Sequence, residues 1–286
     1  KRGAHVFLFN RTHEKAKLLA KEVGAQAIEK PIQADLYVNA TGTPLENPVH
    51  LDVRLDTETG LQMWLRQAAK QQALWLSSHR PLHIPPSKSQ TLRAILFASL
   101  ADGRSTITQP LESPDTDSMI AACQALGATI QKNGLELVVD GIGKKRVVQM
   151  HLIDAGNSGI VLRFVAAVAA LFSEKIIILG DESMEKRRSC KALVSGLMQL
   201  GTTVDSNDGN APLTICGPFR PGTISIDGKD SQPVSALLIA SSLLDAPTTI
   251  QVTNQAEKPW VELTLDWLRR QGVGISIDDG SYTVIP

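Results

Sequence analysis

The feature that most constrains the fold is a polar turn that recurs three times, each time directly before an apolar helix. The turns contain Lys88, Asn157 and Ser231 and lie about seventy positions apart, a longer period than that of the common solenoid repeats. A short strand-like stretch precedes each turn, and a run rich in Ala, Leu, Ile and Val follows it. The pattern predicts three copies of one unit.

The sequence after each apolar helix recurs as well. A β-rich run comes first, at 105–111, 175–181 and 248–254, and an amphipathic helix follows it. Each of these helices is predicted to end at a glycine, namely Gly127, Gly201 or Gly272. Two short strands close each unit. The sequence therefore predicts an α/β domain of three strand-helix-strand-helix-strand-strand units over residues 80–286.

Composition narrows the class of partner. The 286 residues include 29 basic and 29 acidic side chains, so no overall field attracts nucleic acid. The longest apolar runs, 160–172 and 234–244, are too short to span a membrane. Three cysteines are too few for a disulfide framework, and neither they nor the six histidines have the spacing of a metal site. We expect a cytoplasmic protein without a metal.

The repeated turns are suited to binding anions, because the first turn of a helix carries free N–H groups and the positive end of the helix dipole. Basic side chains cluster at these turns: Lys88, Arg93, Arg163, Arg187, Arg188 and Lys191. A charge-assisted hydrogen bond contributes about 1.5–3 kcal/mol, more than a helix dipole alone. If the three turns lie on one face of the domain, they form a site for a small polyanion.

Five stretches in order, at 85–103, 155–164, 180–201, 227–238 and 257–272, resemble the EPSP synthase family. The resemblance implies transfer of a carboxyvinyl group from phosphoenolpyruvate to shikimate 3-phosphate, without a cofactor. Lys88 would act in catalysis and contact both substrates, and Ser89 and Arg93 would hold shikimate 3-phosphate. It further implies that the phosphoenolpyruvate site includes Asn157, Gly159, Arg187 and Gln232, and that Ser231 binds the phosphate of the shikimate substrate.

The sequence departs from this family pattern at four positions. Ile160 replaces the usual Thr, and Asp230 stands where a second phosphate-binding Ser is common. We expect the Asp230 carboxylate to repel phosphate. Glu257 and Trp260 stand where the family often has Ser and Tyr. Asp115 has no assigned chemistry and is expected to be a cap or surface acid.

Residues 1–79 lie outside the repeat and have a β-α-β pattern, the unit of doubly wound sheets. They resemble part of the NADP-binding domain of shikimate dehydrogenase. The resemblance implies that Arg11, flanked by Asn10 and Thr12, holds the 2′-phosphate of NADP. It also places Gly60 near the nicotinamide and Gln67 against shikimate. The glycine-rich turn that would hold the pyrophosphate is absent from this sequence, so hydride transfer by this chain alone is not expected.

We therefore predict a partial doubly wound nucleotide-binding unit at 1–79, followed by an EPSP synthase-like domain at 80–286. The chain is expected to be continuous with further domains in a longer shikimate-pathway polypeptide, and to lack full activity by itself. Its expected partners are the two small-molecule substrates. A second interpretation is a catalytically inactive module that binds shikimate 3-phosphate or acts as a scaffold. A third, an NADP-binding protein, is disfavoured by the missing glycine-rich turn.

Overall fold

The computed structural model describes residues 84–286 continuously. Before them it describes residues 7–9, 17, 20–21, 26–28, 38–39, 51–52, 66–67 and 70. The chain divides into two compact units, Lys1–Ile84 and Pro85–Pro286. The predicted boundary at residues 79 and 80 falls a few residues before this division.

The first unit contains two pairs of parallel strands. Strand β1 (Phe7–Phe9) pairs with β2 (Gln26–Ile28), and β3 (Val38–Asn39) pairs with β4 (Leu51–Asp52). Strands β1 and β3 lie inside the two stretches that the β-α-β pattern predicted as strands, whereas β2 and β4 were not predicted. Gln67 occupies a helical position and is exposed. The residues predicted to bind NADP, Asn10, Arg11, Thr12 and Gly60, lie outside the described residues.

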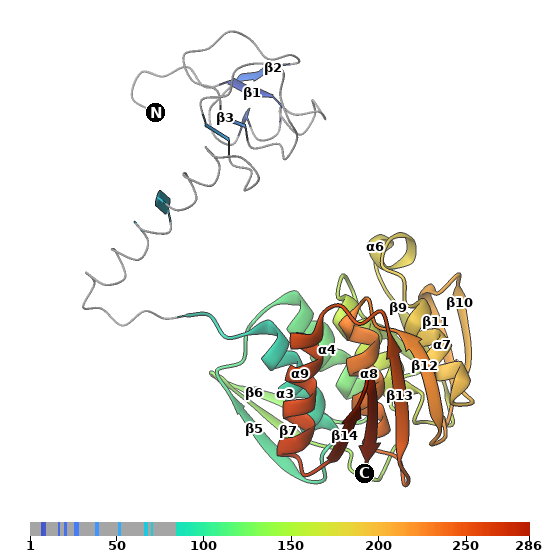
Figure 1. The fold of residues 1–286 in the computed structure, drawn as a ribbon. Helices are drawn as coiled ribbons and strands as arrows, with labels where there is room; N and C mark the ends of the chain where they lie inside the picture. Colours follow the sequence, from blue (N-terminus) through green and yellow to red (C-terminus); the bar gives the residue numbers. More distant parts are fainter. Residues whose placement is uncertain are drawn as a thin grey trace. The chain divides into compact units, whose positions relative to one another are not determined.

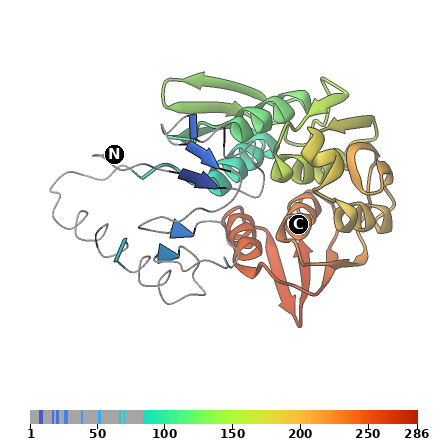
Figure 2. The same ribbon diagram turned by 90° about the horizontal axis from the view of Figure 1, so that it is seen from above.

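The second unit has a mixed α/β fold in which three sheets lie outside a group of helices (Figures 1 and 2). The first sheet has the order β5 (Arg104–Thr108), β7 (Glu136–Asp140), β6 (Thr129–Asn133). The second has the order β10 (Thr203–Asn207), β11 (Asn210–Cys216), β9 (Lys175–Leu179), β8 (Leu152–Asp154). The third has the order β12 (Thr223–Asp227), β13 (Thr248–Thr253), β15 (Ser281–Ile285), β14 (Gly274–Asp278).

Strand pairing follows one pattern in the second and third sheets. Strands β8 and β9 are parallel, as are β12 and β13, and every other pair in these two sheets is antiparallel. A helix connects each parallel pair: α5 (Gly159–Ala169) follows β8, and α8 (Ser231–Ser241) follows β12. In the first sheet, β7 pairs antiparallel with both β5 and β6. Helix α3 (Lys88–Leu100) precedes β5.

Helices α5 and α8 pack against each other at the centre of this unit. Ten of the eleven residues of each helix are buried. Because each buried aliphatic side chain stabilises the fold by about 1.5–3 kcal/mol, these two helices anchor the core. The remaining helices are α4 (Pro114–Ala125), α6 (Glu182–Lys186), α7 (Lys191–Gln199) and α9 (Lys258–Arg270). Helix α6 was not predicted, because five residues do not complete two helical turns.

The predicted helix-ending glycines lie directly after the C-caps of α4, α7 and α9. Their φ angles are 113° at Gly127, 88° at Gly201 and 83° at Gly272. Glycine adopts this left-handed conformation without steric cost, and it frees the chain to turn toward the next strand. In this respect the prediction from the sequence is confirmed.

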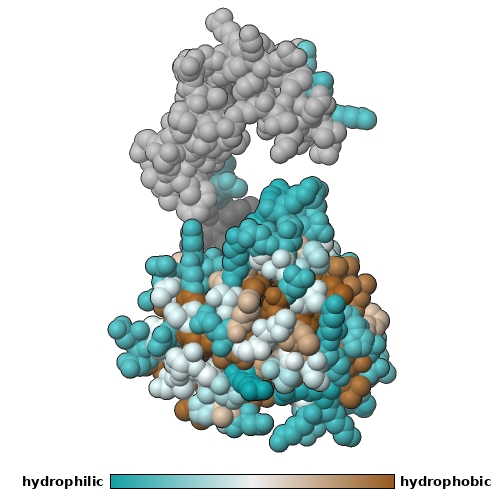
Figure 3. Space-filling view, turned by 90° about the vertical axis from the view of Figure 1, so that its right-hand side faces the viewer, coloured by the Kyte–Doolittle hydropathy of each residue, from teal (hydrophilic) through white to brown (hydrophobic). Residues whose placement is uncertain are grey.

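Hydrophilic side chains cover much of the face shown in Figure 3, and apolar residues lie in patches between them. The buried apolar residues of the second unit form one continuous core. Among the residues that the structure describes, we find no helix of the length and apolar character that crossing a bilayer requires.

Candidate functional site

Side-chain caps define the starts of α3, α5 and α8. Ser87 accepts a hydrogen bond from the Gln90 N–H, and Ser158 accepts one from the Val161 N–H. The Asp230 carboxylate accepts the Gln232 N–H at 2.9 Å. The three predicted polar turns are therefore the N-terminal ends of three helices.

Asp115, in the first turn of α4, joins the starts of α3 and α5. Its Oδ2 atom lies 3.5 Å from Lys88 Nζ, and its Oδ1 atom accepts a hydrogen bond from the Ser158 hydroxyl. The expectation that Asp115 is only a cap or surface acid was incomplete. This link could not be predicted from local sequence patterns, because Ser158 lies 43 positions further along the chain.

Arg163 joins the starts of α5 and α8. Its Nη1 donates to the Gly159 carbonyl at 3.2 Å and to Gln232 Oε1 at 2.9 Å. Its Nη2 donates to the Ser189 carbonyl at 2.8 Å and lies 3.2 Å from Asp230 Oδ2. We expected the Asp230 carboxylate to repel phosphate. The structure shows that this carboxylate is paired with the Arg163 guanidinium, and the repulsion of phosphate stays a prediction.

Arg188, rather than Arg187, contacts the turn before α5. Its guanidinium donates to Asn157 Oδ1 at 3.3 Å and lies 3.4 Å from the Asn157 carbonyl oxygen. A Cβ atom at Gly159 would lie 3.6 Å from Arg188 Nη1 and only 2.7 Å from Arg163 Nη1. The absence of a side chain at this position thus admits the Arg163 guanidinium, whereas the distance to Arg188 is an ordinary van der Waals contact. Arg187 caps the C-terminus of α6 and is exposed, and its side chain makes no hydrogen bond or ion pair within residues 84–286.

Arg93 is buried and faces the protein interior. Its Nε and Nη2 donate to the Thr264 hydroxyl at 3.0 and 2.8 Å, and its Nη1 donates to the Ser89 carbonyl at 3.1 Å. The guanidinium carbon lies 5.2 Å from the centre of the Phe164 ring. Burial lowers the pKa of Arg93 to about 10. We expected Arg93 to present its charge to a ligand, but in this structure it ties α3 to α9.

Ser231 is buried at the start of α8 and donates to a carboxylate of the same chain. Its hydroxyl lies 2.7 Å from Glu257 Oε2, and its backbone nitrogen lies 3.3 Å from the same oxygen. Glu257 precedes α9, so this contact brings the starts of α8 and α9 together. The donors predicted to bind a substrate phosphate therefore already have a partner.

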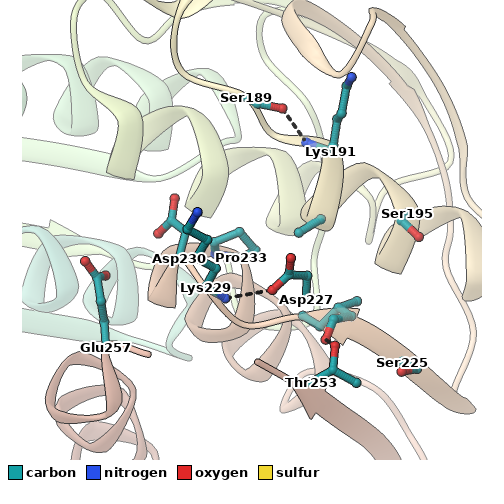
Figure 4. Close-up of a pocket in the computed structure, with 12 residues that line it drawn as sticks. Ser189, Lys191, Ser195, Ser225, Asp227, Lys229, Asp230, Pro233, Thr253 and Glu257 are labelled. Atoms are coloured by element: carbon teal, nitrogen blue, oxygen red, sulfur yellow. Dashed lines mark hydrogen bonds between the residues drawn. The ribbon is translucent and has the colours of Figure 1, made fainter. Parts of the chain in front are cut away.

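An open pocket of about 680 Å³ adjoins this cluster, between α7 and the start of α8. Figure 4 shows Asp230 and Glu257 on one side of the pocket and Ser195 and Ser225 on the other. Lys191 and Lys229 also line it. Within the described part of the chain, no three His, Cys, Asp or Glu residues are grouped as metal ligands would be.

These contacts place Lys88, Ser89, Asn157, Gly159, Ser231 and Gln232 around one group of helix starts. The arrangement is that of a mixed α/β domain whose polar end can bind a small anionic molecule. The chain belongs to the EPSP synthase (3-phosphoshikimate 1-carboxyvinyltransferase) family, whose model matches residues 79–286.

Curated relatives support this assignment. The chain is 42% identical over 205 residues to a 3-phosphoshikimate 1-carboxyvinyltransferase of Chlamydia caviae, a match that covers 71% of this chain and 46% of the relative. It is 40% identical over 216 residues to one of Chlamydia trachomatis, covering 74% and 49%. An EPSP synthase structure from Acinetobacter baumannii shares the fold, with a TM-score of 0.62 and 21% identity over 71% of this chain and 46% of that one. The matched part thus spans a little under half of each relative.

Proposed function

We propose that this chain carries part of a site for carboxyvinyl transfer from phosphoenolpyruvate to shikimate 3-phosphate. One observation carries the proposal. Inside the region that matches the family, hydrogen bonds and ion pairs join the starts of α3, α5 and α8 through Asp115 and Arg163. Helix starts gathered in this way concentrate N–H donors and cations where a polyanion can be bound.

In this proposal Lys88 is the main cation that contacts both substrates. Its side chain is 52% exposed and its contact with Asp115 is long, so it can turn toward a ligand. Asn157, Gly159 and Gln232 line the phosphoenolpyruvate side. Arg187 and Arg188 together supply the positive charge on that side. Of these two arginines, the sequence assigned only Arg187 to the phosphoenolpyruvate site.

Ser89 and Ser231 complete the side that holds shikimate 3-phosphate. Arg93 supports that side by fixing α3 against α9, since its nitrogens already donate to protein oxygens. In the transfer, the 5-hydroxyl oxygen bonds to C2 of phosphoenolpyruvate and loses its proton, while C3 takes up a proton. The tetrahedral intermediate then loses a proton from C3, and the C2–O bond to phosphate breaks, so that inorganic phosphate leaves. Fixed cations stabilise the negative charge in such an intermediate, and no cofactor is required.

The test is calorimetric titration of the chain with shikimate 3-phosphate at two salt concentrations. Lys88→Met should weaken binding about tenfold or more, as expected for a charge-assisted contact, and added salt should reduce the difference. Lys132→Met is the matched control, because Lys132 lies on β6 of the first sheet, is similarly exposed and also pairs with a carboxylate, that of Glu112. Equal affinities of the two variants, or no binding by the unaltered chain, would contradict the proposal.

We also propose that the second unit descends from one repeated element, because the second and third sheets share the same order of strand pairing.

We further propose that residues 1–79 include a remnant of an NADP-binding domain, on the basis of the sequence pattern around Arg11. If Arg11 holds the 2′-phosphate, the chain should bind NADP more tightly than NAD, and Arg11→Ala should abolish that preference. Equal binding of both nucleotides by the unaltered chain would refute it.

A further inference from the structure

We infer that Glu257 determines how strongly this site binds phosphate: its carboxylate occupies the donors at the start of α8, and a ligand phosphate can reach them only by displacing it. The inference rests on the proposed function, because it concerns the phosphate side of that same site. The inference gives Glu257 a role in ligand specificity, although Glu257 lies outside the three polar turns that contain Lys88, Asn157 and Ser231.

The donors at the start of α8 are held by two carboxylates of the chain. Glu257 Oε2 accepts the Ser231 hydroxyl at 2.7 Å and the Ser231 N–H at 3.3 Å. Asp230 Oδ1 accepts the next N–H, that of Gln232, at 2.9 Å. Ser231 is only 3% exposed, so its hydroxyl has little access to water as an alternative partner. These are the groups that an incoming anion would use.

The two carboxylates differ in how their charge is offset. Asp230 lies 3.2 Å from the Arg163 guanidinium. Glu257 forms no ion pair with a lysine or arginine in the continuous segment 84–286. Within that segment, its carboxylate is held by the Ser231 donors, at the positive end of the α8 dipole. A phosphate placed on the same donors would bring a second negative charge within a few ångströms, and the two anions would repel each other.

Nothing else in α9 requires the Glu257 side chain. Glu257 precedes the first residue of α9, but its carboxylate accepts no hydrogen bond from the first turn of that helix. Pro259, near the start, has no N–H that needs a cap. Glu257 is also exposed, so its side chain can move into solvent when a ligand binds. The Glu257 carboxylate therefore accepts hydrogen bonds from α8 and none from the first turn of α9, so we expect a substitution at Glu257 to leave the start of α9 intact.

The experiment compares shikimate 3-phosphate with unphosphorylated shikimate as titrants in calorimetry. Glu257→Gln keeps the size of the side chain and removes its charge, whereas Glu257→Ser removes the acceptor as well. Glu262→Gln is the control, because Glu262 is an exposed glutamate on α9 whose nearest ion-pair distance, to Arg269, is 3.8 Å. Thermal unfolding confirms that each variant is folded, and the Gln variant preserves the shape of the site.

Both Glu257 variants should bind shikimate 3-phosphate about tenfold more tightly or better, the size of one charge-assisted hydrogen bond. Their affinity for shikimate should change less than about twofold, because shikimate has no phosphate to place at α8. Unchanged affinity for the phosphorylated ligand would overturn the inference and leave the proposed function standing. An equal gain for both ligands would overturn it too. If no variant bound either ligand, both the inference and the proposed function would fail.

Discussion

Arg93 and Arg163 occupy comparable places in the molecule but differ in how their charge is neutralised. Each lies one turn into its helix and donates to the carbonyl four residues earlier, Ser89 for Arg93 and Gly159 for Arg163. Each also reaches a side chain of another helix, Thr264 on α9 or Gln232 on α8. Both are at least 95% buried.

The difference lies in their charged partners. Arg163 pairs with Asp230, whereas Arg93 has only neutral acceptors and the face of Phe164 in the part of the chain that the structure describes. Burial without a carboxylate lowers the pKa of Arg93 to about 10. Removing Arg163 would therefore leave the Asp230 carboxylate without its cation, which destabilises the fold. Removing Arg93 would instead abolish the desolvation penalty of a buried charge that has no carboxylate partner. The position of an arginine one turn into its helix therefore does not predict whether it has a charged partner.

The largest effect is expected for Arg163→Met. The substitution removes the cation that contacts Asp230 and Gln232. The free energy of unfolding of the second unit should fall by about 3 kcal/mol. This value is at the low end for a broken buried ion pair, because the Asp230 side chain is 42% exposed. Urea unfolding followed by circular dichroism measures the change. A loss below about 1 kcal/mol would mean that the pair contributes no more than a surface ion pair.

A smaller loss is expected for Arg93→Met, about 1 kcal/mol or less. The variant loses the hydrogen bonds to Thr264 but also removes a buried charge, and the Thr264 hydroxyl keeps the Trp260 carbonyl as an acceptor. The same urea experiment compares the two variants directly. If Arg93→Met were as damaging as Arg163→Met, the distinction between paired and unpaired cations would be wrong.

The smallest effect is expected for the exposed pair of Arg104 and Asp140, whose two contacts are 2.8 and 2.9 Å. The hydrogen bond from Arg104 lowers the pKa of Asp140 below its ordinary value. Because the folded-state pKa is the lower one, the pair contributes stability at neutral pH and loses it as the pH falls through that pKa. The difference in unfolding free energy between the unaltered chain and Arg104→Met should be small at pH 7 and vanish once the pH lies below the lowered pKa of Asp140. A difference that persisted there would show that Arg104 acts through packing.

The sequence predicted the fold of residues 84–286 well because its signals are local. Apolar periodicity and glycines after helices act within a few positions, and Gly127, Gly201 and Gly272 lie where the pattern placed them. Helix α6 was missed because its five residues are too few to show a period.

The partners of the site residues could not be predicted in the same way. Lys88 and Asp115 meet through packing of α3 on α4, and Ser231 meets Glu257 across 26 positions. Arg187 and Arg188 are neighbours at the end of α6, but only the Arg188 side chain contacts Asn157. Which of the two makes this contact depends on where α6 ends. Local spacing identifies cations near the turns, but tertiary contacts decide which of them are available to a ligand.

The hydrogen bond from Arg93 to Thr264 joins residues 171 positions apart. During synthesis, α3 therefore leaves the ribosome long before the helix that fixes its guanidinium exists. A nascent chain that has completed the first sheet still holds Arg93 without its acceptor, and a fragment that stops before α9 lacks both Thr264 and the carboxylate that faces Ser231. Contacts of such high sequence separation form late and slowly. The contacts that Arg93 and Ser231 make with α9 and the residue before it can therefore form only after α9 has been synthesised.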